Sequence, residues 1–422
     1  MAGEINLNHI CKIEGHANLK VKIENGKIKE CNLEAYEGAR FFEALVLGKN
    51  IRDIQEIVSR ICGICSCSHS VCAIQALENC LGVKPTEKEK ALREILVLAE
   101  RIRSHATHLY FLALPDYHGE SAIMTAKHDK QKLDDALEII TLGNKIIETH
   151  SGREMHPFVK FNSENVDFEN IKKELEEIKP VIKRTIALFS NLKYPDFSRK
   201  INFSSLAEEK TYASISGKIS CNGKKFESED YGKHLKENIK EYSTSKFVLM
   251  DNKPYLLGAI SRINNNHEKL DEDIKKEIRE HHIQIPFTNP FHNNIAQALE
   301  LMYLVARIEF LIKKLKNIKD DGKKEKEFKI KAGKGVAAIE APRGTLFHEY
   351  EIDSDGKITY CNIITPTCQN LNQMEIDIKD YMQTLLNFPK GKIVLEIEKL
   401  IRAYDPCFSC STHFLEVEWE ES

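Results

Sequence analysis

The chain has 422 residues, of which 42% are hydrophobic and 30% are charged, and its formal net charge is −3. This length exceeds what one simple hydrophobic core holds, so two or three closely packed parts are expected. The small net charge excludes a nucleic-acid footprint and a polybasic membrane patch, and no apolar run approaches the roughly 20 residues of a membrane span.

Residues 1–50 are expected to form a β region. The N-terminus lacks a basic segment followed by an apolar one, which predicts a cytoplasmic chain without a secretion signal. Apolar and polar residues alternate from Asn18 to Ile23, and the strand pattern resumes at Ile28 after a turn at Asn25-Gly26. These features predict two paired strands that lead into helices.

Helical spacing dominates residues 51–200, the expected helical core. Three segments show it: Ile51–Leu81, about Lys88–Leu114 before Pro115, and about Asp129–His150. Residues 201–265 carry short β-like runs, Thr211–Ser216 and Lys246–Met250 among them, which predict an α+β insertion.

Residues 266–413 combine helices, a β hairpin and a cysteine motif. Helices are predicted near residues 270–283, 294–315, 374–386 and 394–403. One strand of the hairpin is predicted from Val336 to Leu346, with a turn at 353–356 and a return through 358–360. No repeat or low-complexity linker separates these parts. We therefore expect one interdigitated α+β body across residues 1–422, predominantly helical, with a central helical bundle and peripheral β elements.

Two spaced cysteine pairs stand apart from the other cysteines of the chain. Twelve cysteines without a secretion signal argue against a disulfide framework, because cytosolic thiols are kept reduced. Cys62 and Cys65 form one Cys-x-x-Cys pair, and Cys407 and Cys410 form the other. Their separation along the chain far exceeds the roughly 15 to 20 residues between the pairs of a zinc ribbon. A buried site for a soft redox metal therefore fits better than a structural zinc, which stays an alternative.

Motifs spread over nearly the whole chain make it resemble the large, catalytic subunit of nickel–iron hydrogenases. They are Lys12–His16, Arg60–Cys65 followed by His69, Gly152–Pro157, Glu340–Gly344 and Asp405–His413. Ser104-His105 and Leu114–Asp116 direct the similarity to the cytosolic, cofactor-coupled branch, of NAD(P)-linked, sulfhydrogenase or methanogen type. The resemblance implies the hydrogenase large-subunit fold and reversible heterolytic cleavage of H2 into protons and electrons.

The resemblance also implies two metal sites. Nickel would be bound by Cys62, Cys65, Cys407 and Cys410. Cys65 and Cys410 would bridge it to an iron that carries carbon monoxide and cyanide. Glu43 and His413 would hold a second ion, magnesium or a similar divalent cation, near the C-terminus.

Four residues acquire catalytic roles from the same resemblance. Glu14 would accept the proton released at a nickel thiolate, that of Cys410. Arg343 would place its guanidinium over the metals, and Asp405 would orient that side chain. Lys12 stands where the family usually has arginine, which puts a local salt bridge in doubt.

Five residues are implied to bind the cofactor around the metals. Arg343 and Thr367 would donate hydrogen bonds to the two cyanides, and His69 would donate to a bridging sulfur. Pro342 and Pro366 belong to the same two motifs and would line the cofactor pocket.

The chain's other cysteines lack the set of four that an electron-transfer iron–sulfur cluster needs. A separate iron–sulfur small subunit is therefore implied, with diaphorase-like electron-transfer subunits and NADP as a candidate acceptor. A maturation protease and nickel-insertion proteins are implied as well, because residues 414–422 resemble a cleaved extension; a retained tail is the alternative. Two other functions stay open: a membrane-bound energy-converting hydrogenase and a metal-free, complex I-like quinone-site scaffold.

Overall fold

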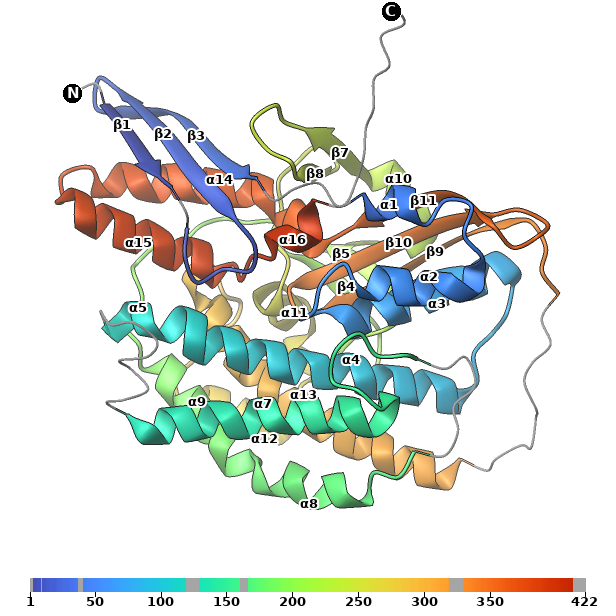
Figure 1. The fold of residues 1–422 in the computed structure, drawn as a ribbon. Helices are drawn as coiled ribbons and strands as arrows, with labels where there is room; N and C mark the ends of the chain where they lie inside the picture. The colour runs from blue at the N-terminus through green and yellow to red at the C-terminus, as the bar shows by residue number, and fades with distance from the viewer. Residues whose placement is uncertain are drawn as a thin grey trace, which may run out of the picture.

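The structure is a computed structural model that describes residues 3–8, 10–36, 41–118, 129–159, 166–318 and 329–412. A layer of long helices lies beneath several small antiparallel sheets, as Figure 1 shows. Helix exceeds strand by 52% to 19%. The predicted fold class, predominantly helical α+β, is confirmed.

The N-terminal sheet has the order β1 (Gly3–Leu7), β2 (Ala17–Glu24) and β3 (Lys27–Ala35), all antiparallel. Asn25 and Gly26 both have positive φ, 51° and 72°, which suits a two-residue hairpin turn. The two predicted strands are confirmed, whereas β1 was not expected from the sequence. β3 packs against α14 (Pro366–Leu385).

The central bundle is built around α4 (Glu87–Thr107), which lies against α7 (Lys130–Ser151) and α13 (Asn293–Asn317) (Figure 1). α4 begins with a capping box, because Thr86 and Glu89 satisfy each other's backbone N–H groups. It continues beyond its predicted end, through the π-helical η1 (His108–Ala113) into α5 (Leu114–His118). α8 (Glu169–Glu177), α9 (Lys179–Ser190) and α12 (Glu272–Glu280) complete this layer.

The helix predicted over Ile51–Leu81 is in fact two helices. α2 (Ile51–Ser59) ends before the Arg60–Cys65 segment, and α3 (Ser66–Leu81) begins after it. α3 lies tightly on the sheet, because a Cβ on Gly335 would collide with the Ala76 carbonyl. The break gives the first cysteine pair a loop between two helices.

The sheet beside α3 has the order β11 (Ile358–Ile364), β10 (Gly344–Ile352) and β9 (Gly333–Ala341). The single strand predicted from Val336 to Leu346 is wrong, because the chain reverses at Pro342-Arg343 and Gly344 pairs with Ala341. Gly344 has φ +134°, where a side chain is strained, and a Cβ there would meet Leu257 Cβ at 2.5 Å. The tight turn places Arg343 at the tip of a hairpin.

The expected α+β insertion contains two further small sheets. Its elements are β4 (Ser204–Ala207), β5 (Lys218–Cys221), β6 (Lys224–Phe226), η2 (Ser228–Asp230), α10 (Tyr231–His234), β7 (Leu235–Ile239), β8 (Lys246–Met250) and α11 (Ala259–Asn266). The predicted run at Lys246–Met250 is β8, but the run at Thr211–Ser216 is not a strand.

The remaining short elements are α1 (Phe42–Leu45), η3 (His267–Lys269) and η4 (Pro290–His292). α15 (Lys390–Ala403) leads to α16 (Phe408–Ser411), which carries the second cysteine pair. Among the described residues, no helix is both long and apolar enough to cross a membrane.

Candidate metal centre

The loop between α2 and α3 fixes the first cysteine pair. Cys65 is the N-cap of α3, and the Ile64 N–H lies 3.3 Å from Cys62 Sγ. Arg103 of α4 donates to the Ile64 carbonyl at 2.9 Å. A buried arginine from the bundle therefore holds the backbone between the two thiols.

The segment after α15 fixes the second pair. Asp405 has φ 51°, an uncommon left-handed conformation for a non-glycine residue. Cys407 follows as the N-cap of α16, and its N–H donates to Thr367 Oγ1 at 2.9 Å. The N-terminus of α14, where Thr367 lies, thereby orients the second pair.

The four sulfur atoms lie within 4.8 Å of one another. Cys62 Sγ is 3.6 Å from Cys407 Sγ, and Cys65 Sγ is 3.3 Å from Cys410 Sγ. All four side chains are buried. Metal–thiolate bonds of about 2.3 Å put the sulfurs around one ion at such spacings. In the described part of the chain, this is the one group of three or more His, Cys, Asp or Glu residues arranged to hold a metal.

The protonation of the thiols depends on their mutual contacts. The sulfur atoms of Cys407 and Cys410 lie close enough for a disulfide, whereas metal binding requires both as thiolates. The hydrogen bond from Cys65 lowers the pKa of Cys62, and the same contact, with burial, raises the pKa of Cys65. The first pair therefore holds one thiolate more readily than two.

A cavity with about 260 Å³ of space free of protein atoms adjoins the sulfurs. Its lining contains Cys65, His69, Ala341, Pro342, Arg343, Leu346, Pro366, Thr367, Cys407 and Cys410. Arg343 Nη1 is buried there and has no hydrogen-bond partner among the described residues. Such an orphaned donor indicates a missing acceptor. Soft thiolate ligands and a free guanidinium donor fit a thiolate-bound metal centre with acceptor ligands of its own.

Asp405 orients Arg343 as the resemblance implied. Arg343 Nε donates to the Asp405 carbonyl at 2.8 Å, and Nη2 donates to Oδ1 at 3.1 Å. Burial opposes the charged guanidinium, but Asp405 and the nearby cysteines raise the pKa of Arg343 above its usual value. Gln297 donates to Asp405 Oδ2 at 3.1 Å and holds the carboxylate from the opposite side.

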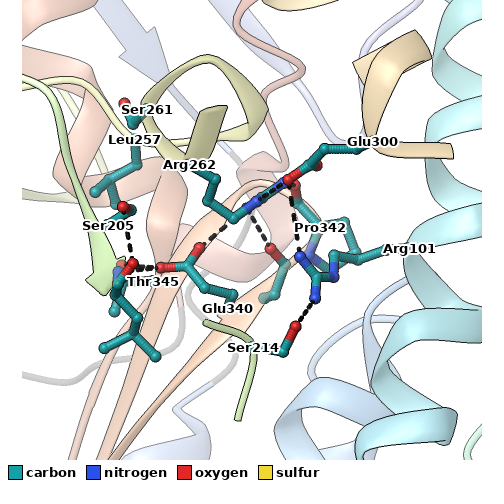
Figure 2. A network of polar contacts seen from close by, with 12 residues as sticks. Arg101, Ser205, Ser214, Leu257, Ser261, Arg262, Glu300, Glu340, Pro342 and Thr345 are labelled. Atoms are coloured by element: carbon teal, nitrogen blue, oxygen red, sulfur yellow. Dashed lines mark hydrogen bonds and ion pairs between the residues drawn. The ribbon is translucent and has the colours of Figure 1, made fainter. Parts of the chain in front are cut away.

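A buried ionic network supports the turn that carries Arg343 (Figure 2). Arg262 of α11 donates to the Ala341 and Pro342 carbonyls, each at 3.0 Å. The same guanidinium binds both carboxylate oxygens of Glu300, at 2.6 and 2.7 Å, and contacts Glu340 at 3.0 Å. Burial alone would raise the pKa of Glu300, yet Arg262 lowers it well below its usual range. No motif in the sequence pointed to Arg262.

The other predicted cofactor residues lie where their roles require. Thr367 accepts from Cys407 N, which leaves its own O–H available to donate toward the cavity. Pro366 is the first residue of α14, where its fixed φ suits a helix start. His69 lies in the cavity wall, one turn after Cys65, and its backbone N–H donates to the Cys65 carbonyl at 3.2 Å.

Glu14 contacts a different cysteine from the one expected. Its Oε2 lies 2.9 Å from Cys407 Sγ and accepts from the Ser409 N–H at 3.1 Å. Its carbonyl accepts from the Phe408 N–H at 2.9 Å. The expected proton donor was Cys410, whereas the described contact is with Cys407.

Lys12 forms the salt bridge that its departure from arginine put in doubt. Its ammonium pairs with Asp116, which also accepts from Arg402 Nη1 at 2.5 Å. Arg402 Nε donates to the Cys11 carbonyl at 2.9 Å. The loop that carries Glu14 is thus attached to α5 and α15.

Gly15 allows this loop to approach α16. It has φ +80°, and a Cβ there would lie 2.8 Å from Ser409 N and 2.9 Å from Phe408 Cβ. We expect Gly15→Ala to displace Glu14 from Cys407 and to lower the free energy of unfolding by about 1–3 kcal/mol. Thermal unfolding and hydrogen turnover measure the two effects.

Gly26→Ala is the matched control for this substitution. Gly26 has a similar φ of +72°, and a Cβ there would meet no atom within 4 Å. It therefore bears the backbone strain without the collision. Equal losses of activity in the two variants would contradict the positioning role of Gly15.

Glu43 and His413 do not share a described site. Glu43 Oε1 accepts from Lys246 Nζ at 3.0 Å and from the Ile363 N–H at 2.7 Å. Burial raises the pKa of Glu43, although Lys246 opposes that shift. His413 and residues 414–422 lie outside the described residues. The second metal site and the removal of the tail stay predictions.

The comparisons with known proteins agree with this geometry. The family model described as nickel-dependent hydrogenase matches residues 40–152 and 133–413. The chain is 35% identical to the alpha chain of sulfhydrogenase 1 of Pyrococcus furiosus, with 97% of each chain covered. It is 30% identical to a component of the F420-non-reducing hydrogenase of Methanothermobacter thermautotrophicus, over 98% of this chain and 95% of that one.

A solved structure shares the fold. It is the NAD+-reducing [NiFe]-hydrogenase in the H2-reduced state, with a TM-score of 0.88 and 23% identity over 97% of this chain and 99% of that chain. The hydrogenase large-subunit fold predicted from the motifs is therefore confirmed. By its sequence and by the fold around its four thiols, the chain belongs to the nickel-dependent hydrogenase family.

Proposed function

We propose that the chain binds a nickel–iron centre through Cys62, Cys65, Cys407 and Cys410 and catalyses the reversible cleavage of H2. The observation that carries the proposal is the cavity in which four buried thiols converge beside the unpartnered Arg343 Nη1. When bound, such a centre supplies the redox chemistry that splits H2 heterolytically. The membrane-bound and complex I-like alternatives are not favoured by the relatives found.

The protein's own groups suit carbon monoxide and cyanide as iron ligands. Arg343 Nη1 and the Thr367 hydroxyl are donors at the cavity wall, and cyanide nitrogen is an acceptor. The Arg343 guanidinium is held rigidly by Asp405, so it needs little reordering to donate. The remaining lining, which includes Pro342, Pro366 and Leu346, is apolar and excludes water.

Infrared spectroscopy and metal analysis of the purified complex test this assignment. We expect nickel and iron in the chain, together with stretching bands of carbon monoxide and cyanide. Zinc alone would support a structural site, and absence of both metals from fully matured protein would overturn the proposal.

Glu14 is proposed to be the first proton acceptor. The 2.9 Å contact with Cys407 Sγ lets a proton on that sulfur pass directly to the carboxylate. The Ser409 N–H fixes the accepting oxygen, Oε2. Proton release at Cys407 would thus leave the cavity toward the N-terminal loop.

Glu14→Gln is expected to lower hydrogen turnover by about 10²- to 10⁴-fold, because an amide cannot take up the proton. Nickel and iron contents and the infrared bands should not change, since Glu14 is not a proposed ligand. Dye reduction under H2 gives the rate. Glu30→Gln on exposed β3 is the matched control. A variant that loses its metals, or keeps its rate, would contradict the proton role.

An iron–sulfur small subunit is the proposed electron partner. The support is that the relatives found are named as single components of larger hydrogenases, as in sulfhydrogenase 1 and the F420-non-reducing enzyme. Diaphorase-like subunits, NAD(P) as acceptor, maturation proteins and a cytoplasmic location belong to the same proposal. Reduction of NAD+ or NADP+ by H2 in the intact complex tests the acceptor.

A further inference from the structure

Three buried side chains form a line that leads away from the cavity: His69, His348 and Tyr350. His69 lies in the cavity wall with Cys65 and Cys410. His69 Nδ1 is 3.0 Å from His348 Nε2, and His348 Nδ1 is 2.7 Å from the Tyr350 hydroxyl. The three side chains are at most 1% exposed. Their hydrogen bonds therefore form away from bulk water.

The packing of α3 on β10 creates this line. His348 and Tyr350 are two positions apart on β10 and so project from one face of the sheet. Cys72 Sγ lies 3.5 Å from the Leu346 carbonyl, and Cys80 Sγ lies 3.3 Å from the Tyr350 carbonyl. These contacts fix the register of α3, the helix that carries His69, along the strand.

The Tyr350 hydroxyl determines the direction of the hydrogen bonds. Within the described ranges, its hydrogen-bond partner is His348 Nδ1. If that nitrogen carried the proton, the buried tyrosine O–H would have no acceptor, which is costly. Burial also raises the pKa of Tyr350 far above its usual value, which keeps the phenol protonated. Tyr350 therefore donates to His348 Nδ1.

The direction then passes along both imidazoles. A neutral histidine that accepts at Nδ1 carries its proton at Nε2, so His348 donates to His69 Nδ1. His69 in turn carries its proton at Nε2. The opposite arrangement would present a nitrogen lone pair at a cavity wall that contains thiolates, where a donor is electrostatically preferred.

We propose that His348 and Tyr350 are positioning residues that hold His69 as an Nε2–H donor to the thiolates of the metal centre. The inference rests on the proposed function, because it concerns these sulfurs as metal ligands. Hydrogen bonds to metal-bound sulfur weaken its electron donation and so tune the centre. The line thus gives residues far from the metal control over its electronic state.

Infrared spectroscopy of the assembled enzyme tests the role of His348. His348→Met cannot donate to His69 Nδ1, so His69 no longer has a fixed tautomer. We expect the carbon monoxide band to move to lower wavenumber, because sulfurs without a hydrogen bond donate more electron density to the iron. His348→Gln presents an amide N–H near the position of Nε2, and its band should stay at the wild-type position.

Tyr350→Phe tests the same line with a smaller change. It removes only the hydroxyl, and we expect a band shift in the same direction as in His348→Met. Tyr255→Phe is the matched control, because Tyr255 is also fully buried and donates one hydrogen bond, to Gln369 at 2.9 Å. Its band should not move, even if its thermal stability falls as much as that of Tyr350→Phe.

The failures of the two proposals are distinguishable. Wild-type bands in both His348→Met and Tyr350→Phe would overturn the positioning role and leave the proposed function intact. Equal shifts in His348→Gln or Tyr255→Phe would overturn it too, because they would reflect general loosening. Absence of carbon monoxide and cyanide bands from the wild-type enzyme would overturn the proposed function itself, and the positioning role with it.

Discussion

Replacing Cys65 with alanine is expected to reduce hydrogen turnover to background. Cys65 Sγ is 3.3 Å from Cys410 Sγ and is one of four sulfurs gathered at the cavity. A methyl group cannot ligate a metal, and three thiolates cannot complete the proposed set. Metal analysis of the purified chain should show loss of nickel and iron, and dye reduction under H2 should show loss of activity.

Cys67→Ala is the control that separates ligation from packing. Cys67 lies two residues away and is fully buried, but it does not belong to the four-sulfur group. Burial raises the pKa of Cys67 well above its usual value, so it stays a neutral thiol. We expect this variant to keep both metals. Equal metal loss in the two variants would show that the cysteines of this segment act only through packing.

Arg262→Met is expected to lower the free energy of unfolding by about 3–5 kcal/mol, because it leaves two buried carboxylates without their cation. Glu300 and Glu340 are both fully buried and both bind Arg262. Hydrogen turnover should fall too, since the Pro342 carbonyl loses its donor and the Arg343 turn loses its support. Chemical unfolding and dye reduction measure these effects.

Arg184→Met is the matched control for stability. Arg184 pairs with Asp135 through two contacts but is 47% exposed, and such a pair contributes at most about 1 kcal/mol. A similar loss in both variants would contradict the importance of burial.

The effect of Arg262→Met should also depend on pH. Arg262 lowers the pKa of Glu300 in the folded wild type, so this stabilisation is present above the unfolded carboxylate pKa of about 4.3 and is lost as the pH falls. Without the arginine, burial raises the pKa of Glu300, and the folded variant binds a proton more readily than the unfolded chain. The difference in stability between the two proteins should therefore narrow as the pH falls toward about 4.

Local patterns predicted the regular elements that lie far from the metal centre. β2 and β3 follow from alternation around a two-residue turn, and α7 follows from its helical periodicity. The breaks that shape the site were missed. Helical spacing on both sides concealed the loop at Arg60–Cys65, and apolar residues on both sides of Pro342 concealed the hairpin tip.

The candidate site was predicted in composition more than in contact. Thiol spacing and family motifs identified the four cysteines and Arg343, and the structure brings them together at one cavity. The contact of Glu14 with Cys407 depends on how a loop docks on α16, which no local pattern records. Arg262 and His348 were missed because a buried arginine and a strand histidine carry no distinctive signal in one sequence.

The pairing of Glu14 with Cys407, in a short parallel bridge, has a consequence for the order of assembly. Cys62 and Cys65 leave the ribosome early, whereas Cys407 follows 345 residues after Cys62. Closing a loop of that length costs about 5 kcal/mol of chain entropy, which the folded remainder must offset first. The four-thiol pocket therefore closes last, when α16 docks between the N-terminal loop and α14. Until then an incoming ion meets only a two-thiol half-site, so metal delivery and the final docking of the chain are coupled events.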